Sequence, residues 1–287
     1  MPDSTAHVLV VGVDGVRYDT LQSCDTPTID AIAANGFLRP VRVNDAGPTI
    51  SGPGWATVFT GVLADRHRIF DNNLSPNQLA QFPDFVHHAG QVRPEIARFV
   101  GAGWAPLVTA ESGGPLFADG GYYPDGGPAH SEDEWTRVDD AVTDAGAQFL
   151  RAHDGAHGSA AVVYLGGPDE VCHLVGVCPA YSAFIEASDA RIGRLLAAVD
   201  ARPTRANENW AVIVVTDHGH VDEGGHGGDT PEERTAWIAA AGAGVPADLG
   251  DAVLEQADVA AHALAVLGID AAAPAQMTGR PFGRRAA

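Results

Sequence analysis

The sequence predicts an α/β fold, a mainly parallel central sheet sandwiched by helices on both faces, with residues 1–287 forming a single domain. Short apolar runs rich in β-branched residues alternate along the chain with longer Ala-rich segments. This alternation is typical of parallel strands joined by helices. Hydrophobic residues make up 45% of the 287 positions, which is enough for a sizeable core. We therefore expect a layered fold in which the sheet is buried between helices.

The first part of the chain contains two predicted strands around one predicted helix. His7–Val13 reads as a buried strand, because its apolar run is continuous and ends in a loop at Asp14-Gly15. A helix is expected from Thr26 to Ala34, with a proline early in its first turn and Asn35-Gly36 as its end. Phe37–Val43 follows as another strand.

Ser51–Thr60 is predicted to be a helix with Ser51 at its N-terminal cap, Pro53 in its first turn and Gly61 at its end. Residues 62–130 are rich in glycine, proline and aromatic residues, which predicts a loop-rich insertion. Within this insertion only a helix near Asp84–His88 is expected.

The second half of the chain continues the alternation of strands and helices. The predicted helices are Glu132–Ala152, Ala180–Val199 and Asp258–Leu267. The predicted strands are Ala160–Leu165, Trp210–Thr216 and Thr235–Ala240.

The charge of the chain limits its partners. The formal net charge is −20, and all 17 basic residues are arginine. The absence of lysine excludes Schiff-base enzymes and nucleotide sites that need the P-loop lysine. The acidic balance argues against a nucleic-acid polymer or an anionic membrane as partner, although it would also serve solubility alone. A small anionic substrate would need a local positive centre, which metal ions supply.

The hydropathy of the chain predicts neither a membrane span nor a secretory signal. It contains no run of about 18 apolar residues. No basic segment precedes the apolar run Val8–Val13. We expect a cytoplasmic protein without a membrane partner, and the oligomeric state is left open.

Three predicted strands are each followed by an aspartate: Asp14, Asp169 and Asp217. Because ligands collect beyond the carboxyl ends of parallel strands, we expect these carboxylates to meet at one edge of the sheet. A single aspartate at a strand end is more often a cap for the next helix. Three of them, two with nearby histidines, favour a shared metal site.

Three histidines accompany these aspartates. His173 lies four residues after Asp169, a spacing that places both side chains on one face of a helical turn. His218 is adjacent to Asp217, and His226 stands among four glycines, where it has little core to pack into. This number of carboxylate and imidazole ligands exceeds the need of one ion. It matches two zinc ions about 3.5–4 Å apart, with manganese or iron as alternatives.

Ser51 is the predicted nucleophile. It would lie at a helix N-terminus, where backbone N–H groups and the helix dipole favour a phosphoryl group. A metal ion on its Oγ would lower the pKa of its hydroxyl. Two alternatives remain open: Ser51 only caps the helix, or Thr49 is the nucleophile.

Five segments in a fixed order carry a family resemblance: residues 13–19, 26–36, 49–61, 65–72 and 258–270. Together they resemble the alkaline phosphatase superfamily, in its type I phosphodiesterase/nucleotide pyrophosphatase branch. The resemblance extends over nearly the whole chain. It implies an alkaline phosphatase-like fold and a hydrolase that cleaves small phosphorylated substrates through a covalent phosphoserine.

The resemblance also implies two zinc sites. Their ligands would be Asp169, His173 and His226 in one, and Asp14, Asp217, His218 and the Ser51 hydroxyl in the other.

One position departs from the family. Many members carry Asn just after the proline, where this chain has Gly54. Stabilisation of the phosphoryl oxygens would then fall to the metals, the Gly52 amide or Asn72. Trp55 is either a further substrate contact or an ordinary core residue.

Three alternative functions share these residues. A phosphomonoesterase would use the same site. A sulfatase resembles Cys/Ser-x-Pro-x-Arg at the nucleophile, and here Trp55 stands in the Arg position. A non-catalytic metal-binding protein would keep the ligands without turnover, and the intact ligand set argues against it.

Overall fold

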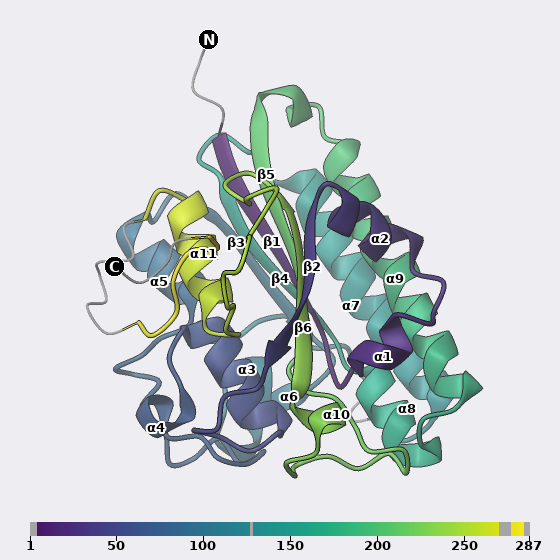
Figure 1. Ribbon diagram of the computed structural model, residues 1–287. Helices are drawn as coiled ribbons and strands as arrows, with labels where there is room; N and C mark the ends of the chain where they lie inside the picture. The colour runs from purple at the N-terminus through teal and green to yellow at the C-terminus, as the bar shows by residue number, and fades with distance from the viewer. Residues whose placement is uncertain (1–4, 127–128, 270–276, 284–287) are drawn as a thin grey trace.

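The computed structural model describes residues 5–126, 129–269 and 277–283, which form a six-stranded sheet with helices on both faces (Figure 1). Asp270, the end of the last resemblance segment, lies outside the described residues. The strands are β1 (Thr5–Val13), β2 (Gly36–Arg42), β3 (Ala97–Ala102), β4 (Ser159–Leu165), β5 (Glu208–Val215) and β6 (Thr235–Gly242). Their order across the sheet is β2-β6-β5-β1-β4-β3. The predicted α/β class is confirmed.

Strand β1 lies inside the sheet and pairs in parallel with β5 and β4, and β3 extends the parallel set beyond β4. Val8 and Val10 of β1 face one layer of helices, whereas Leu9 and Val11 face the other. This alternation follows from the two-residue period of a strand. Burial on both faces explains why β1 is a continuous apolar run.

Strand β6 runs against the parallel set, because it is antiparallel to both β5 and β2. The connection from β5 to β6 contains only the four-residue helix α10 (Pro231–Arg234). A helix this short cannot carry the chain back across the sheet, so β6 starts at the edge where β5 ends. Both ends of this connection therefore lie at the carboxyl edge of the parallel strands.

Two layers of helices cover the sheet (Figure 1). One layer contains α2 (Pro27–Ala34), α7 (Glu132–Ala152), α8 (Gly167–Val175) and α9 (Pro179–Asp200). The opposite layer contains α3 (Ser51–Thr60), α5 (Phe85–Val92) and α11 (Asp258–Val266). Shorter helices are α1 (Tyr18–Leu21), α4 (Ala64–His67), α6 (Ala105–Val108) and the 3₁₀ turns Glu111–Gly113 and Arg205–Asn207.

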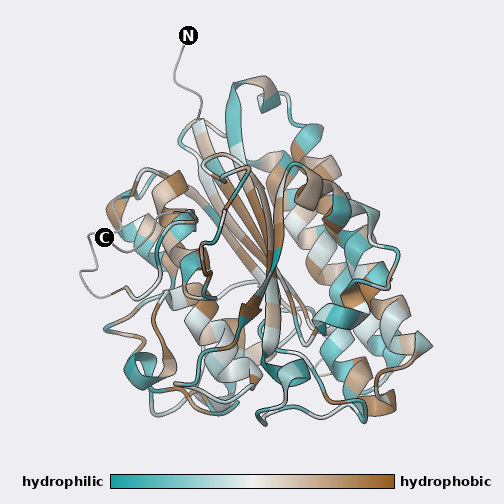
Figure 2. Cartoon of the chain, viewed as in Figure 1, coloured by the Kyte–Doolittle hydropathy of each residue, from teal (hydrophilic) through white to brown (hydrophobic). Residues whose placement is uncertain are grey.

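Hydropathy follows these layers. Figure 2 shows apolar strands at the centre and polar residues on the outer helices. Each face of the sheet has its own buried apolar cluster, one beneath α3 and α11 and one beneath α7 and α9. Among the described helices, none combines the length and apolar character needed to cross a bilayer.

Two local predictions differ from the structure. No strand was expected within residues 62–130, yet β3 forms there; its sequence Ala-Arg-Phe-Val-Gly-Ala carries little β propensity, and pairing with β4 decides its conformation. Ser51 is the first residue of α3 rather than its cap. Ile50 holds the cap position without a side-chain bond, so the Ser51 hydroxyl is not committed to the helix backbone.

A buried ion pair closes the opposite end of the sheet from the predicted ligands. Arg202 donates two short hydrogen bonds to Glu208, and both side chains are almost fully buried. Trp210 Nε1 and the Thr204 hydroxyl also donate to this carboxylate. Burial raises the pKa of Glu208, but these hydrogen bonds outweigh burial and hold the pKa at about 2. The cluster links β5 to the end of α9.

We expect Glu208→Gln to lower the free energy of unfolding by about 3–5 kcal/mol at pH 7, because it leaves the Arg202 guanidinium buried without its counter-charge. The native pKa lies below the usual 4.5, so the contribution is complete above pH 4.5 and is lost as the pH falls toward 2. The difference between the two proteins should therefore shrink below pH 4.5 in urea denaturation.

Asp200→Asn is the matched control. Asp200 pairs with Arg205 nearby, but its side chain is 74% exposed. Its loss should change the free energy of unfolding by no more than about 0.5 kcal/mol. Equal changes in the free energy of unfolding for the two substitutions would show that the buried pair stabilises the protein no more than an exposed pair does.

Candidate metal centre and nucleophile

Three neighbouring parallel strands, β4, β1 and β5, end at the same edge of the sheet, the lower edge in Figure 1. The segment after β1, the first turns of α8 after β4 and the connection after β5 meet there. They bring together the predicted ligands Asp14, Asp169, His173, Asp217, His218 and His226.

Asp14, Asp217 and His218 form an inner group, and all three are fully buried. His218 Nε2 lies 3.3 Å from Asp217 Oδ2 and 3.7 Å from Asp14 Oδ1. Ser51 Oγ lies 3.3 Å from the same nitrogen. The first residue of α3 thus points its hydroxyl at a set of carboxylate and imidazole atoms that suits a divalent cation.

Asp169, His173 and His226 form an outer group. Asp169 Oδ2 lies 3.4 Å from His173 Nε2, and Asp169 Oδ1 lies 3.6 Å from His226 Nε2. The Nε2 atoms of His173 and His226 are 2.9 Å apart. The His173 side chain is 41% exposed, so this group faces solvent. The rings of His218 and His226 stack at 3.9 Å, which makes the two groups neighbours.

Backbone carbonyls fix the orientation of two of these rings. His218 Nδ1 lies 3.1 Å from the Gly219 carbonyl oxygen, and His226 Nδ1 lies 2.7 Å from the Thr49 carbonyl oxygen. A carbonyl can only accept a hydrogen bond, so each Nδ1 carries the proton and donates. Each Nε2 then presents its lone pair to the carboxylates, as a metal-binding imidazole requires.

Asp14 and Asp217 form no ion pair with an arginine among the described residues. Asp14 Oδ1 and Asp217 Oδ2 are buried without a hydrogen-bond partner. Burial and the neighbouring carboxylates raise the pKa of Asp14 well above its usual value, and burial and Asp169 raise the pKa of Asp217 to about 7. Buried oxygens that repel one another in this way fit a site for divalent cations, and their mixture with imidazoles suits zinc.

Asp169 differs from the other two carboxylates. Burial raises its pKa, but hydrogen bonds with His173 and His220 outweigh burial and leave the pKa well below its usual value. Burial and the nearby His226 lower the pKa of His218, which keeps this imidazole neutral and able to act as a ligand.

Trp55 lies behind the site rather than on it. Its Nε1 donates a 2.9 Å hydrogen bond to Asp14 Oδ2, and the Tyr164 hydroxyl donates to the same oxygen. The Trp55 side chain is fully buried, and its ring lies against Gly12, where a Cβ would approach it to 2.7 Å. The expected substrate contact by Trp55 is therefore wrong. Trp55 orients Asp14 instead, so that Asp14 Oδ1 is left facing His218.

Gly52 and Asn72 are the two other predicted substrate contacts, and they lie beside Ser51. The Gly52 N–H donates a 2.9 Å hydrogen bond to Asn72 Oδ1, so this amide is already occupied. The Asn72 side chain is exposed, and its bond with the residue after Ser51 holds it near the nucleophile. A Cβ on Gly54 would lie 2.8 Å from Asp217 Cβ, which explains why the position after the proline carries no side chain here.

Thr49, the alternative nucleophile, is not placed to attack a substrate. Its side chain is fully buried. Its Oγ1 donates a hydrogen bond to the Gly228 carbonyl and accepts one from the Gly227 N–H. Both roles of the hydroxyl are thus taken, whereas Ser51 Oγ faces the inner group.

Sequence reasoning missed several residues that hold the ligands in place. His220 is fully buried, and its Nε2 lies 2.9 Å from Asp169 Oδ1. Asp139 accepts the N–H groups of Gly166 and Gly167, which fixes the start of α8. The only sequence signal for His220 is that it is a second histidine close after Asp217. Asp139 lies in the middle of a predicted helix and has no local signal of its role.

Gln256 is a further positioning residue that the sequence did not indicate. Its Nε2 donates to the backbone carbonyls of Thr216 and Asp217, at 3.0 and 2.7 Å, and its side chain is buried. These bonds satisfy the carbonyls at the end of β5 and fix the turn that carries Asp217.

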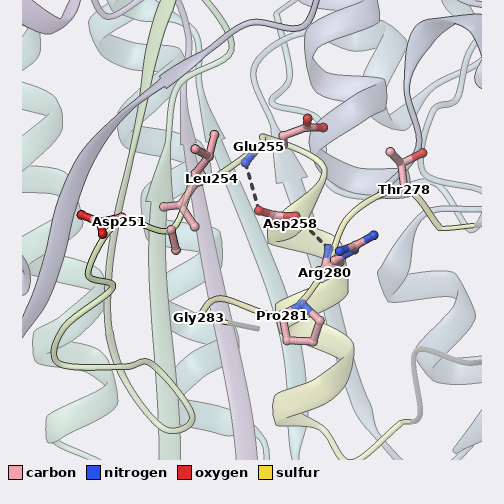
Figure 3. Close-up of a pocket in the computed structure, with 10 residues that line it drawn as sticks. Asp251, Leu254, Glu255, Asp258, Thr278, Arg280, Pro281 and Gly283 are labelled. Atoms are coloured by element: carbon pink, nitrogen blue, oxygen red, sulfur yellow. Dashed lines mark hydrogen bonds between the residues drawn. The ribbon is translucent and has the colours of Figure 1, made fainter. Parts of the chain in front are cut away.

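A hollow of about 570 Å³ lies beside α11 (Figure 3). Asp258 accepts hydrogen bonds from the N–H groups of Glu255 and Arg280 at its wall. None of the predicted ligands lines this hollow. The chemistry-bearing residues therefore point to the sheet edge, and not to this cavity, as the functional site.

Known proteins share this fold. A phosphonate monoester hydrolase of Agrobacterium radiobacter superposes with a TM-score of 0.64 at 17% identity, over 98% of this chain and 79% of that chain. A 2-O GAG sulfatase superposes with a TM-score of 0.76 at 14% identity, over 97% of this chain and 73% of that chain. At these identities the likeness establishes the fold.

Comparison of the sequence with known proteins identifies the family. Human ectonucleotide pyrophosphatase/phosphodiesterase family member 7 is 26% identical over 249 residues, which cover 80% of this chain. The chain spans about half of that relative, 51% of its length. The sequence model of the family described as type I phosphodiesterase/nucleotide pyrophosphatase matches residues 8–272. With nearly all of its length matched, the chain belongs to the type I phosphodiesterase/nucleotide pyrophosphatase family, within the alkaline phosphatase superfamily.

Proposed function

We propose that this protein is a metal-dependent phosphoester hydrolase that cleaves small phosphodiesters through a covalent phosphoserine at Ser51. The observation that carries the proposal is the Ser51 hydroxyl, 3.3 Å from His218 Nε2, facing two adjoining groups of carboxylates and imidazoles. Family membership supports the phosphoester chemistry. We further propose two divalent cations, most simply zinc, because six ligands exceed the need of one ion.

The residues of the chain would hold these cations as two sets. Asp14, Asp217, His218 and the Ser51 hydroxyl form the inner set. Asp169, His173 and His226 form the outer set. Bound divalent cations would lower the pKa of the Ser51 hydroxyl and offset negative charge on the phosphoryl oxygens.

The first chemical step is attack by Ser51 Oγ on phosphorus, in line with the ester oxygen that departs. A bond from Ser51 Oγ to phosphorus forms as the bond between phosphorus and the departing oxygen breaks, and the proton of the serine hydroxyl is balanced by the one that the departing alcohol gains. Water then attacks the phosphoserine, and the Ser51–phosphorus bond breaks to release the product and restore the hydroxyl. The N-terminus of α3 favours the phosphoryl group electrostatically, and the Asn72 amide is held beside it by the bond from the Gly52 N–H.

The side chains at the site favour a diester over a monoester. Within the described residues, the hydrogen bonds and ion pairs of the six ligands and Ser51 involve no arginine, and the chain has no lysine. A phosphomonoester dianion carries more charge than a diester monoanion and needs more positive charge nearby. Cations alone, without a cationic side chain, match the diester better.

We expect Ser51→Ala to reduce turnover of bis-p-nitrophenyl phosphate at least about 10³-fold while most of the metal stays bound, because the hydroxyl is one ligand among several. Metal content is measured by mass spectrometry of the dialysed protein. Ser23→Ala is the control, since the Ser23 hydroxyl donates to the Thr20 carbonyl away from the site. Near-normal turnover in the Ser51 variant would remove the serine mechanism.

Wild-type kcat/KM should be higher for bis-p-nitrophenyl phosphate than for p-nitrophenyl phosphate. The reverse order would identify a phosphomonoesterase.

Mass spectrometry of the intact protein should show an unmodified Ser51. This result would exclude the sulfatase alternative, whose nucleophile is a formylglycine. If the zinc-reconstituted protein turned over neither ester, the result would support the alternative of a non-catalytic metal-binding protein.

Asp217→Asn should stabilise the metal-free protein and abolish its response to zinc. The native pKa of about 7 lies above the usual 3.8, so the charged carboxylate costs stability above pH 7, and this cost fades as the pH falls toward 3.8. In chelator at pH 8 we expect the variant to gain about 1–3 kcal/mol in free energy of unfolding. Added zinc should raise the unfolding midpoint of the wild type only.

Asp189→Asn is the control for this measurement. Asp189 is also buried, but its carboxylate accepts the N–H groups of Thr28 and Ile29 and faces no ligand group. Its substitution should lower the stability and leave the zinc response intact. A loss of stability in metal-free Asp217→Asn would contradict the view that the cluster is held together against repulsion.

A further inference from the structure

A hydrogen-bonded clasp joins the segment before the nucleophile to the glycine-rich loop that carries His226. Thr49 contributes three of its bonds, through its carbonyl and its hydroxyl. We propose that Thr49 is a positioning residue that holds His226 in its metal-binding tautomer and place. The proposal rests on the two-metal function proposed above, and it concerns the outer set of ligands.

The Thr49 carbonyl sets the state of the imidazole. Its oxygen lies 2.7 Å from His226 Nδ1, and it can only accept, so it selects the tautomer with the proton on Nδ1. His226 Nε2 is left with its lone pair toward Asp169 and His173. A partner that fixes the second nitrogen of a ligand histidine typically contributes a factor of about 10–100 in metal affinity.

The Thr49 hydroxyl sets the path of the loop. It donates to the Gly228 carbonyl and accepts from the Gly227 N–H, both at 2.9 Å, which are the two residues after His226. Gly227 has a φ of 108°, a conformation that glycine adopts readily and other residues avoid. A loop of glycines has much conformational entropy to lose, so these two bonds supply the order that side-chain packing does not.

Helix α10 anchors the same clasp from the other side. Glu233 accepts the Gly228 N–H at 2.6 Å, and Arg234 donates to the Gly47 carbonyl at 2.8 Å. The loop of His226 and the segment that leads to Ser51 therefore share one framework. Thr49 precedes Ser51 by two residues, so its bonds also relate the position of the nucleophile to that of the outer ligands.

The test compares Thr49→Val with Thr49→Ser. Valine keeps the shape of threonine but removes the hydroxyl, whereas serine keeps the hydroxyl and removes a methyl group. We expect wild type and Thr49→Ser to bind two equivalents of zinc in a chelator competition. Thr49→Val keeps the backbone carbonyl that bonds His226 Nδ1, but it loses the two hydroxyl bonds that hold the loop in place. The weaker equivalent should therefore bind at least about 10-fold less tightly, because the loop no longer holds the imidazole against that carbonyl. Its kcat should recover on adding zinc, because Ser51 and the inner set are intact.

Thr49→Ala is measured in parallel, so that a folding defect specific to valine does not decide the result, and urea denaturation reports the fold of each variant. Two zinc equivalents of wild-type affinity in a folded Thr49→Val or Thr49→Ala protein would overturn the role of Thr49. Equal loss in Thr49→Ser would overturn it as well. Fewer than two equivalents in the wild type would instead defeat the two-metal function, and the role of Thr49 with it.

Discussion

Mutual repulsion among buried carboxylates is the constraint around which this protein is built. Asp14, Asp169 and Asp217 lie at the ends of three adjacent strands, and two of their oxygens have no partner within the described residues. Burying a charge without a partner in a low-dielectric environment costs free energy. The surrounding side chains must therefore hold these carboxylates in place with hydrogen bonds. The hydrogen bonds around the site hold these carboxylates in place, and added positive charge would relieve their repulsion.

The support comes from side chains that do not themselves meet a substrate. Trp55 and Tyr164 grip one oxygen of Asp14 and leave the other oxygen facing His218. Asp139 holds the first backbone amides of α8, which carries Asp169 and His173. Gln256 donates hydrogen bonds to the consecutive backbone carbonyls of Thr216 and Asp217. These residues thus orient the Asp14 carboxylate and fix the backbone that carries Asp169, His173 and Asp217, as the outer partners of metal ligands typically do.

Much of this architecture could be predicted from the sequence, because strands, helices and ligands carry local signals. The apolar run of β1 and the long amphipathic segment of α7 reflect burial, and the Asp169–His173 spacing reflects one helical turn. Trp55, Gln256 and His220 could not be placed, because their roles depend on contacts between residues far apart in the chain. β3 was missed for the same reason: its partner strand, and not its own composition, makes it a strand. The position of Ser51 within α3 was off by one residue, since the cap carries no side-chain signal.

The reversal of β6 has a consequence for how the site can vary. Because Val215 of β5 pairs with Ile238 of β6, residues 216–237 begin and end about one strand spacing apart, roughly 4.8 Å. A closed segment of this kind can lengthen at its tip without moving the strands that anchor it. Asp217 and His218 lie near its fixed start, whereas Asp222 and Glu223 lie exposed farther along. Additional residues at that tip would reshape the rim around the outer histidines while leaving the inner ligands where the sheet holds them.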